Sequence, residues 1–165
     1  MEQRPIIPFS RSKAETILDV ISLLVIVSMI AYVAYEWRNL PDRIPMHFNG
    51  KGEIDGWGNK MSLIALPLIG IIVYVGLTLL SKVPHVYNYP TPITAQNARG
   101  QYQNARLFMN SLKAVIVILF GFIEWSVIQS ARVGNGELNG WVLGFILLML
   151  FGTIIFFIIR SIQLK

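Results

Sequence analysis

Four apolar runs, each long enough to cross a lipid bilayer as a helix, constrain this chain more than any other feature: residues 17–37, 61–80, 112–130 and 141–159. A helix rises about 1.5 Å per residue, so about 20 residues cross the ~30 Å hydrocarbon core. The second and fourth runs carry no charge, and only 14% of all residues are charged, against about 25% in soluble domains. The runs therefore predict an all-α integral membrane protein with four transmembrane helices, which we treat as a single membrane domain over residues 1–165.

The lysine and arginine residues predict how these helices are oriented. With the N-terminus inside the cell, nine of the 14 basic residues fall on the inner side and the others on the outer side, as the positive-inside rule requires. Trp37, Trp57 and Trp141 then lie near the outer interface, where indole rings are enriched. We expect a multi-pass protein of the plasma (inner) cell membrane with both termini in the cytoplasm. The net charge of +5 suits contact with an anionic lipid leaflet, and no segment resembles a nucleic-acid-binding module.

The loop between the first two runs, residues 38–60, is expected to be a structured outer loop. It contains the stretch LPDRIPMHFNGKGEIDGWGNK, in which residues 44–49 alternate as they do in a strand. Asn49-Gly50 and Asp55-Gly56 are both turn signals. The pattern predicts a compact, hairpin-like cap outside the membrane. Five of its side chains are candidates for binding a ligand or partner: His47, Asn49, Glu53, Asp55 and Trp57.

Other chemistry is disfavoured for this outer loop. Its glycines look like a phosphate cradle, but their spacing matches neither G-x-G-x-x-G nor the Walker pattern. A single histidine without cysteine is a poor ligand set for zinc, and the acidic residues do not have EF-hand spacing. We therefore predict neither a metal site nor a cofactor. We expect Asn49 and Asp55 to shape turns and His47 to bond to the loop backbone.

The second loop, residues 81–111, is expected to lie on the inner side. Its prolines break any helix early on, and Thr94 is then available as an N-cap. From there apolar and polar residues separate onto two helical faces, which predicts an amphipathic inner segment that continues into the third span. Contact with lipid and docking of a cytoplasmic partner both fit such a segment.

Glu124 is the acidic residue placed deepest within the apolar runs. A carboxylate at that depth has to face the bundle interior, find a hydrogen-bond donor or stay protonated. Two interpretations are equally compatible with its position: a functional site within the membrane, and a structural hydrogen bond to a neighbouring helix.

Two motifs resemble those of a known family. The outer loop follows the pattern LP-x-x-IP-x-H-x-N-x-x-G-x-x-D-x-W-x-x-K, and the inner loop carries NYP-x-x-IT-x-x-NA-x-x-QY-x-x-AR. Both are similar to the SdpI-like immunity-protein family, a bacterial integral membrane module of unknown function (domain of unknown function 1648). The resemblance implies protection against a secreted toxin peptide and retention of a cytoplasmic repressor at the membrane. It also marks inner-loop candidates: Asn88, Tyr89, Asn97, Gln101, Tyr102 and Arg106. Immunity proteins of this type have additional spanning segments, whereas this chain has four apolar runs.

These observations favour a membrane binding, immunity or signalling protein whose outer loop engages a peptide or another membrane protein. The alternative is a small transporter or proton-coupled membrane component that uses Glu124. We expect no enzymatic activity, because the chain has no cysteine, has two histidines on opposite sides of the membrane, and contains no H-E-x-x-H motif.

Overall fold

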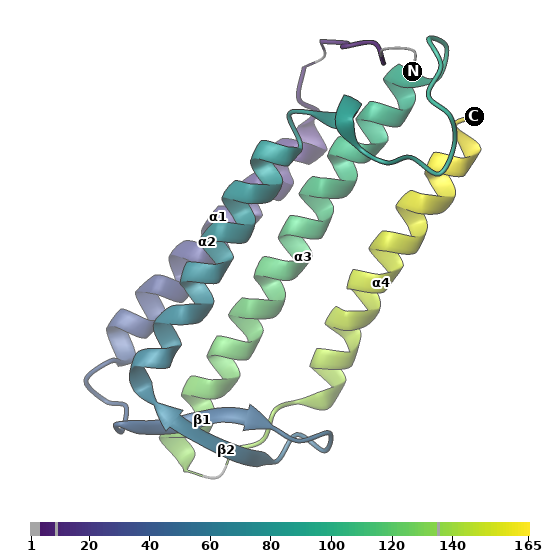
Figure 1. Ribbon diagram of the computed structural model, residues 1–165. Coiled ribbons are helices and arrows are strands. Elements are labelled where there is room, and N and C mark those ends of the chain that lie inside the picture. The colour runs from purple at the N-terminus through teal and green to yellow at the C-terminus, as the bar shows by residue number, and fades with distance from the viewer. Residues whose placement is uncertain (1–3, 9, 135) are drawn as a thin grey trace.

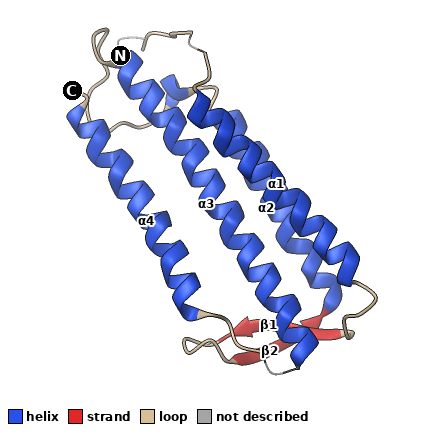
Figure 2. Ribbon diagram, turned by 180° about the vertical axis from the view of Figure 1, so that it is seen from behind, coloured by secondary structure: helices blue, strands red, loops and turns tan. Residues whose placement is uncertain are grey.

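The computed structural model describes residues 4–8, 10–134 and 136–165; residues 1–3, 9 and 135 of the predicted domain lie outside this description. Over the described residues the chain forms, in order, α1 (Lys13–Glu36), β1 (Arg43–Phe48), β2 (Ile54–Asn59), the 3₁₀ helix η1 (Lys60–Ile64), α2 (Ala65–Leu80), the 3₁₀ helix η2 (Pro84–Val86), α3 (Ala98–Val133) and α4 (Gly140–Gln163). The long helices run side by side (Figure 1). The two termini lie at one end of the bundle, here called the terminal end, and the β1–β2 hairpin lies at the other, here called the hairpin end (Figure 2).

Four helices among the described residues are long and apolar enough to span a membrane. The prediction of four helices long and apolar enough to span is confirmed, although the bounds differ and the second of them is η1 and α2 together (Lys60–Leu80). α1 begins at Lys13 because Ser12 and Glu15 form a capping box: the Glu15 amide donates to Ser12 Oγ at 3.2 Å, and the Ser12 amide donates to Glu15 Oε2 at 2.6 Å. α4 begins at Gly140, where the Asn139 side chain accepts hydrogen bonds from the backbone amides of Trp141 and Val142.

α3 is the central helix of the bundle. It contacts α1 and α2 on one side and α4 on the other (Figures 1 and 2). It is 36 residues long, since the inner-loop segment from Ala98 onward and the third apolar run form one uninterrupted helix. Its start differs from the expected one: Asn97 is the N-cap residue, and Thr94 instead exchanges hydrogen bonds with Asn97 one turn earlier.

The segment between α1 and α2 contains a two-stranded antiparallel sheet, so the fold is not purely α-helical. Asn49-Gly50 lies in the turn, as expected, but Asp55-Gly56 lies inside β2 rather than in a second turn. The predicted alternation over residues 44–49 also breaks. Pro45 pairs with Trp57 and His47 pairs with Gly56, so Met46 is the extra residue of a β-bulge. The bulge leaves Ile44 and Pro45 buried and turns Met46 outward.

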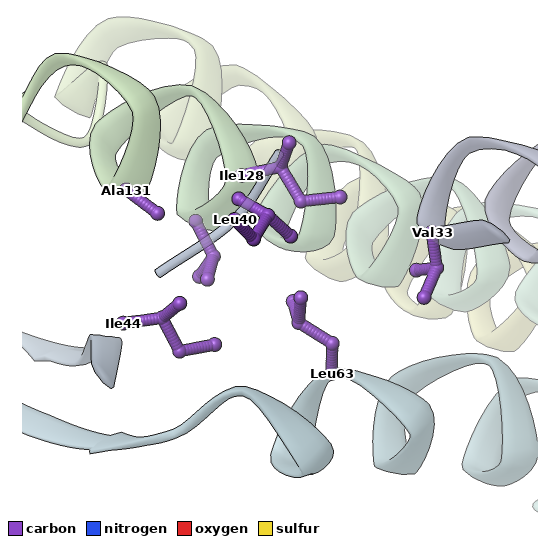
Figure 3. Close-up of a cluster of buried hydrophobic side chains, with 7 residues drawn as sticks. Val33, Leu40, Ile44, Leu63, Ile128 and Ala131 are labelled. Atoms are coloured by element: carbon purple, nitrogen blue, oxygen red, sulfur yellow. The ribbon is translucent and has the colours of Figure 1, made fainter. Parts of the chain in front are cut away.

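The hairpin is fixed to the bundle by a small hydrophobic core, shown in Figure 3. Ile44 of β1 belongs to this core and is fully buried. It packs with buried residues from α1, η1, α3 and the loop after α1: Val33, Leu40, Leu63, Val127, Ile128 and Ala131. Burying one such side chain contributes about 1.5–3 kcal/mol. The core therefore holds the hairpin as a rigid cap on the ends of α1 and α3.

The tip of the hairpin has a second attachment, to the connection between α3 and α4. The Leu138 amide donates to the Gly52 carbonyl oxygen at 2.9 Å. Gly52 has φ +86°, and a Cβ at this position would lie 2.5 Å from the Leu138 carbonyl oxygen. Glycine is required here both by the left-handed backbone and by the close approach.

Candidate functional site

The exposed face of the hairpin presents a histidine–aspartate pair. His47 Nδ1 lies 2.5 Å from Asp55 Oδ1, and the His47 side chain is 73% exposed. Gly56, which pairs with His47, has no side chain to obstruct the contact: a Cβ there would lie 2.9 Å from the His47 Cβ. The expected bond from His47 to loop backbone is replaced by this contact with a carboxylate.

Asn49 and Glu53 shape the tip next to this pair. Asn49 Oδ1 accepts hydrogen bonds from the amides of Lys51 and Glu53 at 2.8 and 3.1 Å, and its Nδ2 donates to Glu53 Oε2 at 2.8 Å. These contacts close the turn in the way an Asx side chain does. The predicted role of Asn49 as a turn-former is therefore confirmed.

Aromatic side chains gather at the hairpin end. Trp57 on β2 and Trp141 at the start of α4 are exposed, and Trp37 caps the C-terminus of α1. Lys60 lies over the Trp37 ring, 5.5 Å from its centroid, and pairs with Asp42 at 3.1 Å. The three tryptophans expected at one membrane interface thus lie at the same end of the bundle. Within the described residues, no three His, Asp or Glu side chains are close enough together to hold a metal ion.

Glu124 lies at a cavity between α1 and α3 of about 650 Å³. Its side chain is buried, with the residue 1% exposed, and Oε1 has no hydrogen-bond partner among the described residues. The walls are mainly apolar or aromatic, including Met29, Phe122 and Trp125. Gly121 allows the two helices to approach closely there, since a Cβ on it would lie 3.0 Å from a Val25 methyl group. Among the described residues, Oε1 therefore does not make the structural hydrogen bond that was one of the two interpretations.

A network of ion pairs is buried toward the terminal end, and sequence reasoning missed it. Lys113 of α3 is fully buried and donates to Asp19 of α1, to Thr78 Oγ1 of α2 at 2.9 Å and to Asn110 Oδ1 at 3.1 Å. Asp19 also pairs with Arg11. The available signal was the presence of Asp19 in the first apolar run and of Lys113 in the third, two charges of opposite sign inside apolar stretches.

The inner-loop candidates take part in separate contacts rather than in one site. Gln101 faces α4, where its Nε2 donates to the Ser161 carbonyl at 2.7 Å and its Oε1 accepts from Ser161 Oγ at 2.6 Å. Arg106 faces α1, and its Nε lies 3.0 Å from Glu15 Oε1. Asn88 is exposed, and Asn97 donates to the Pro92 carbonyl at 3.0 Å.

The tyrosines of the terminal-end loop stack on each other and contact a tyrosine near the start of α3. The Tyr89 ring centroid lies 6.3 Å from that of Tyr87 and 6.0 Å from that of the buried Tyr102, and the Tyr89 hydroxyl donates to the Pro84 carbonyl at 2.7 Å. Burial raises the pKa of Tyr87 to about 12, an effect that the nearby Arg106 partly offsets. The Tyr87 phenol therefore stays protonated and donates to the Leu80 carbonyl at the end of α2.

Comparison with known proteins finds a family match for part of the chain. Residues 24–71 match the family described as Domain of unknown function (DUF1648). This range holds the second half of α1, the whole hairpin and the start of α2, but not Glu124. The chain is also similar to an uncharacterised protein of Archaeoglobus fulgidus, with 25% identity over an alignment of 129 positions that covers 70% of this chain and 70% of that protein. No solved structure matches it. The resemblance to the domain of unknown function is supported, and the immunity role stays a prediction.

Proposed function

We propose that this protein is a multi-pass membrane binding protein, with a signalling or immunity role, whose hairpin recognises a peptide or another membrane protein. The observation that carries the proposal is the exposed His47–Asp55 pair on a hairpin anchored by the buried Ile44. Binding residues are commonly held on surface loops by a rigid scaffold, and here the scaffold is the helix bundle.

The chemistry of the exposed face suits recognition. His47 and Asp55 together offer a donor, an acceptor and a charge, while the half-exposed Trp57 and Met46 offer apolar contact area. Aromatic anchors next to polar groups supply most of the energy at protein interfaces. Because the hairpin is already ordered, a partner would bind with little entropy cost for fixing it. We assign the chain a binding role rather than a catalytic one.

We propose that the protein lies in the plasma membrane. In the proposed orientation the hairpin is outside the cell and the two termini are in the cytoplasm. The distribution of basic residues supports it. The apolar side chains exposed on α2 and α4 would then face lipid. A cytoplasmic regulator is a second candidate partner, at the terminal end.

Photo-crosslinking in living cells tests the hairpin as a binding surface. A benzophenone amino acid replaces Lys51, an exposed residue of the tip whose backbone amide donates to Asn49 Oδ1. We expect a specific adduct that is lost in the backgrounds His47→Ala and Asp55→Ala. The background Asp42→Asn, which alters an exposed acid outside the pair, should keep it. If all three backgrounds gave the same adduct, the His47–Asp55 pair would not be the recognition site.

The buried Glu124 beside its cavity favours a second candidate function, a small proton-coupled transporter. A carboxyl group that lacks a partner within a membrane is available to exchange a proton or a cation. In liposomes with a pH gradient and an internal pH dye, this candidate predicts proton flux through the wild-type protein. Glu124→Gln should abolish the flux, and equal flux in both proteins would contradict the candidate.

A further inference from the structure

The cavity between α1 and α3 has the size and lining of a small-molecule site. Its volume of about 650 Å³ falls within the roughly 300–1,000 Å³ typical of ligand pockets. Its walls are apolar except for a few groups, and Leu24 and Trp125 at its rim are exposed on the outside of the bundle. An occupant can therefore enter sideways from the hydrocarbon layer of the membrane.

Glu124 differs from the other buried acidic residues in its lack of a basic partner among the described residues. The other acidic residues buried in the helices each have a basic partner: Glu15 pairs with Arg106, Asp19 with Lys113, and Glu36 with Arg132 at 3.0 Å. Within the described residues, no such pair involves Glu124, whose Oε1 also lacks a hydrogen bond. An acid in a site of low dielectric interacts strongly with any cation that reaches it.

We propose that this cavity binds a lipophilic cation, with the positive charge at the Glu124 carboxylate and the apolar body against α1 and α3. The apolar walls require an apolar body, and an acyl chain alone would leave the carboxyl group without a partner. The rings of Phe122 and Trp125, whose centroids lie 6.3 Å apart, add aromatic surface of the kind that attracts cations.

This inference rests on the use of Glu124 in the second candidate function and names the ligand class, but it concerns binding alone. Bound ligand without flux would support the site and contradict the transporter. Proton flux without ligand binding would overturn the site and leave the transporter standing.

The test uses the full chain in lipid nanodiscs and tetraphenylphosphonium as the probe. We expect saturable binding that weakens about tenfold or more in Glu124→Gln, a change that corresponds to about 1.4 kcal/mol or more. Tetraphenylborate has the same shape and the opposite charge, so it should not compete. The control Asp42→Asn, at an acid outside the cavity, should bind the probe as the wild type does.

A second variant leaves the carboxyl group intact. Ser28 lines the cavity and is exposed, so Ser28→Phe fills space without removing a buried contact. It should weaken binding of the cation, and quenching of the tryptophan fluorescence by the probe should fall with it. Unchanged affinity in both Glu124→Gln and Ser28→Phe, or equal binding of the borate anion, would overturn the proposal.

Discussion

Asp19 is the residue on which the buried charges of the terminal half depend. It is the anion for both Arg11 and the fully buried Lys113. Removing one member of a buried ion pair leaves the other charge uncompensated and costs about 3–5 kcal/mol. We therefore expect Asp19→Asn to lower the midpoint of thermal unfolding. The midpoint is measured in detergent from the intrinsic fluorescence of the protein.

The controls separate burial from charge. Asp42→Asn breaks the ion pair between Asp42 and Lys60, in which the Asp42 side chain is 90% exposed. It should leave the midpoint unchanged, because surface ion pairs contribute little to stability. Adding Lys113→Met to Asp19→Asn removes the stranded cation and should recover much of the lost stability. A midpoint for Asp19→Asn equal to that of Asp42→Asn would show that the network does not stabilise the fold.

At this scale the sequence identifies unusual residues but not their partners. Glu124 stands out because a charge within an apolar run is rare, and the structure places it at a cavity. The partnership of Asp19 and Lys113 joins residues 94 positions apart. It depends on how α1 lies against α3, which hydrophobic periodicity does not encode. The same holds for Gln101 and Ser161.

Among the elements, the attachment of the hairpin tip to the α3–α4 connection depends on Gly52. Gly50, in the same turn, is the matched control. Gly52 has a left-handed backbone and contacts the Leu138 carbonyl, whereas nothing lies within 4 Å of a Cβ at Gly50. An L-residue in the left-handed region costs about 1–2 kcal/mol. We expect Gly52→Ala to break the hydrogen bond from the Leu138 amide to the tip.

Hydrogen exchange measures this effect directly. The Leu138 amide should exchange faster in Gly52→Ala than in the wild type, and Gly50→Ala should match the wild type. Amides within α1 should be unaffected in both variants, because the Ile44 core still holds the base of the hairpin. Equal protection of Leu138 in the two variants would show that the tip is not attached through Gly52.

The elements also show where local patterns stop being informative. The turn at Asn49-Gly50 is encoded by two adjacent residues, and it is present in the structure. Asp55-Gly56 has the same local signal but lies in a strand, because the bulge at Met46 and the pairing with β1 fix that register. Tertiary pairing overrides the local preference there. The continuous α3 follows because the segment after Asn97 contains no proline.

The arrangement of the whole molecule gives its two ends different surfaces. The hairpin end carries the exposed Trp57 and Trp141 and the His47–Asp55 pair. The terminal end carries the loop between α2 and α3, flanked by Lys82 and Arg99, and both chain termini (Figure 1). Since α4 packs on α3 and exposes most of its length, much of the lateral surface is apolar. A molecule with an apolar belt and two unlike ends should insert with one fixed orientation.

Single-cysteine labelling tests that orientation, and the chain has no cysteine of its own to interfere. Gly50→Cys places a thiol at the hairpin tip, where a side chain meets nothing within 4 Å, and Lys165→Cys places one at the exposed C-terminus. In intact cells a membrane-impermeant maleimide should label the first variant and not the second, whereas both should react after permeabilisation. Labelling of Lys165→Cys alone in intact cells would reverse the assignment of the two ends, and the hairpin would then have to find its partner in the cytoplasm.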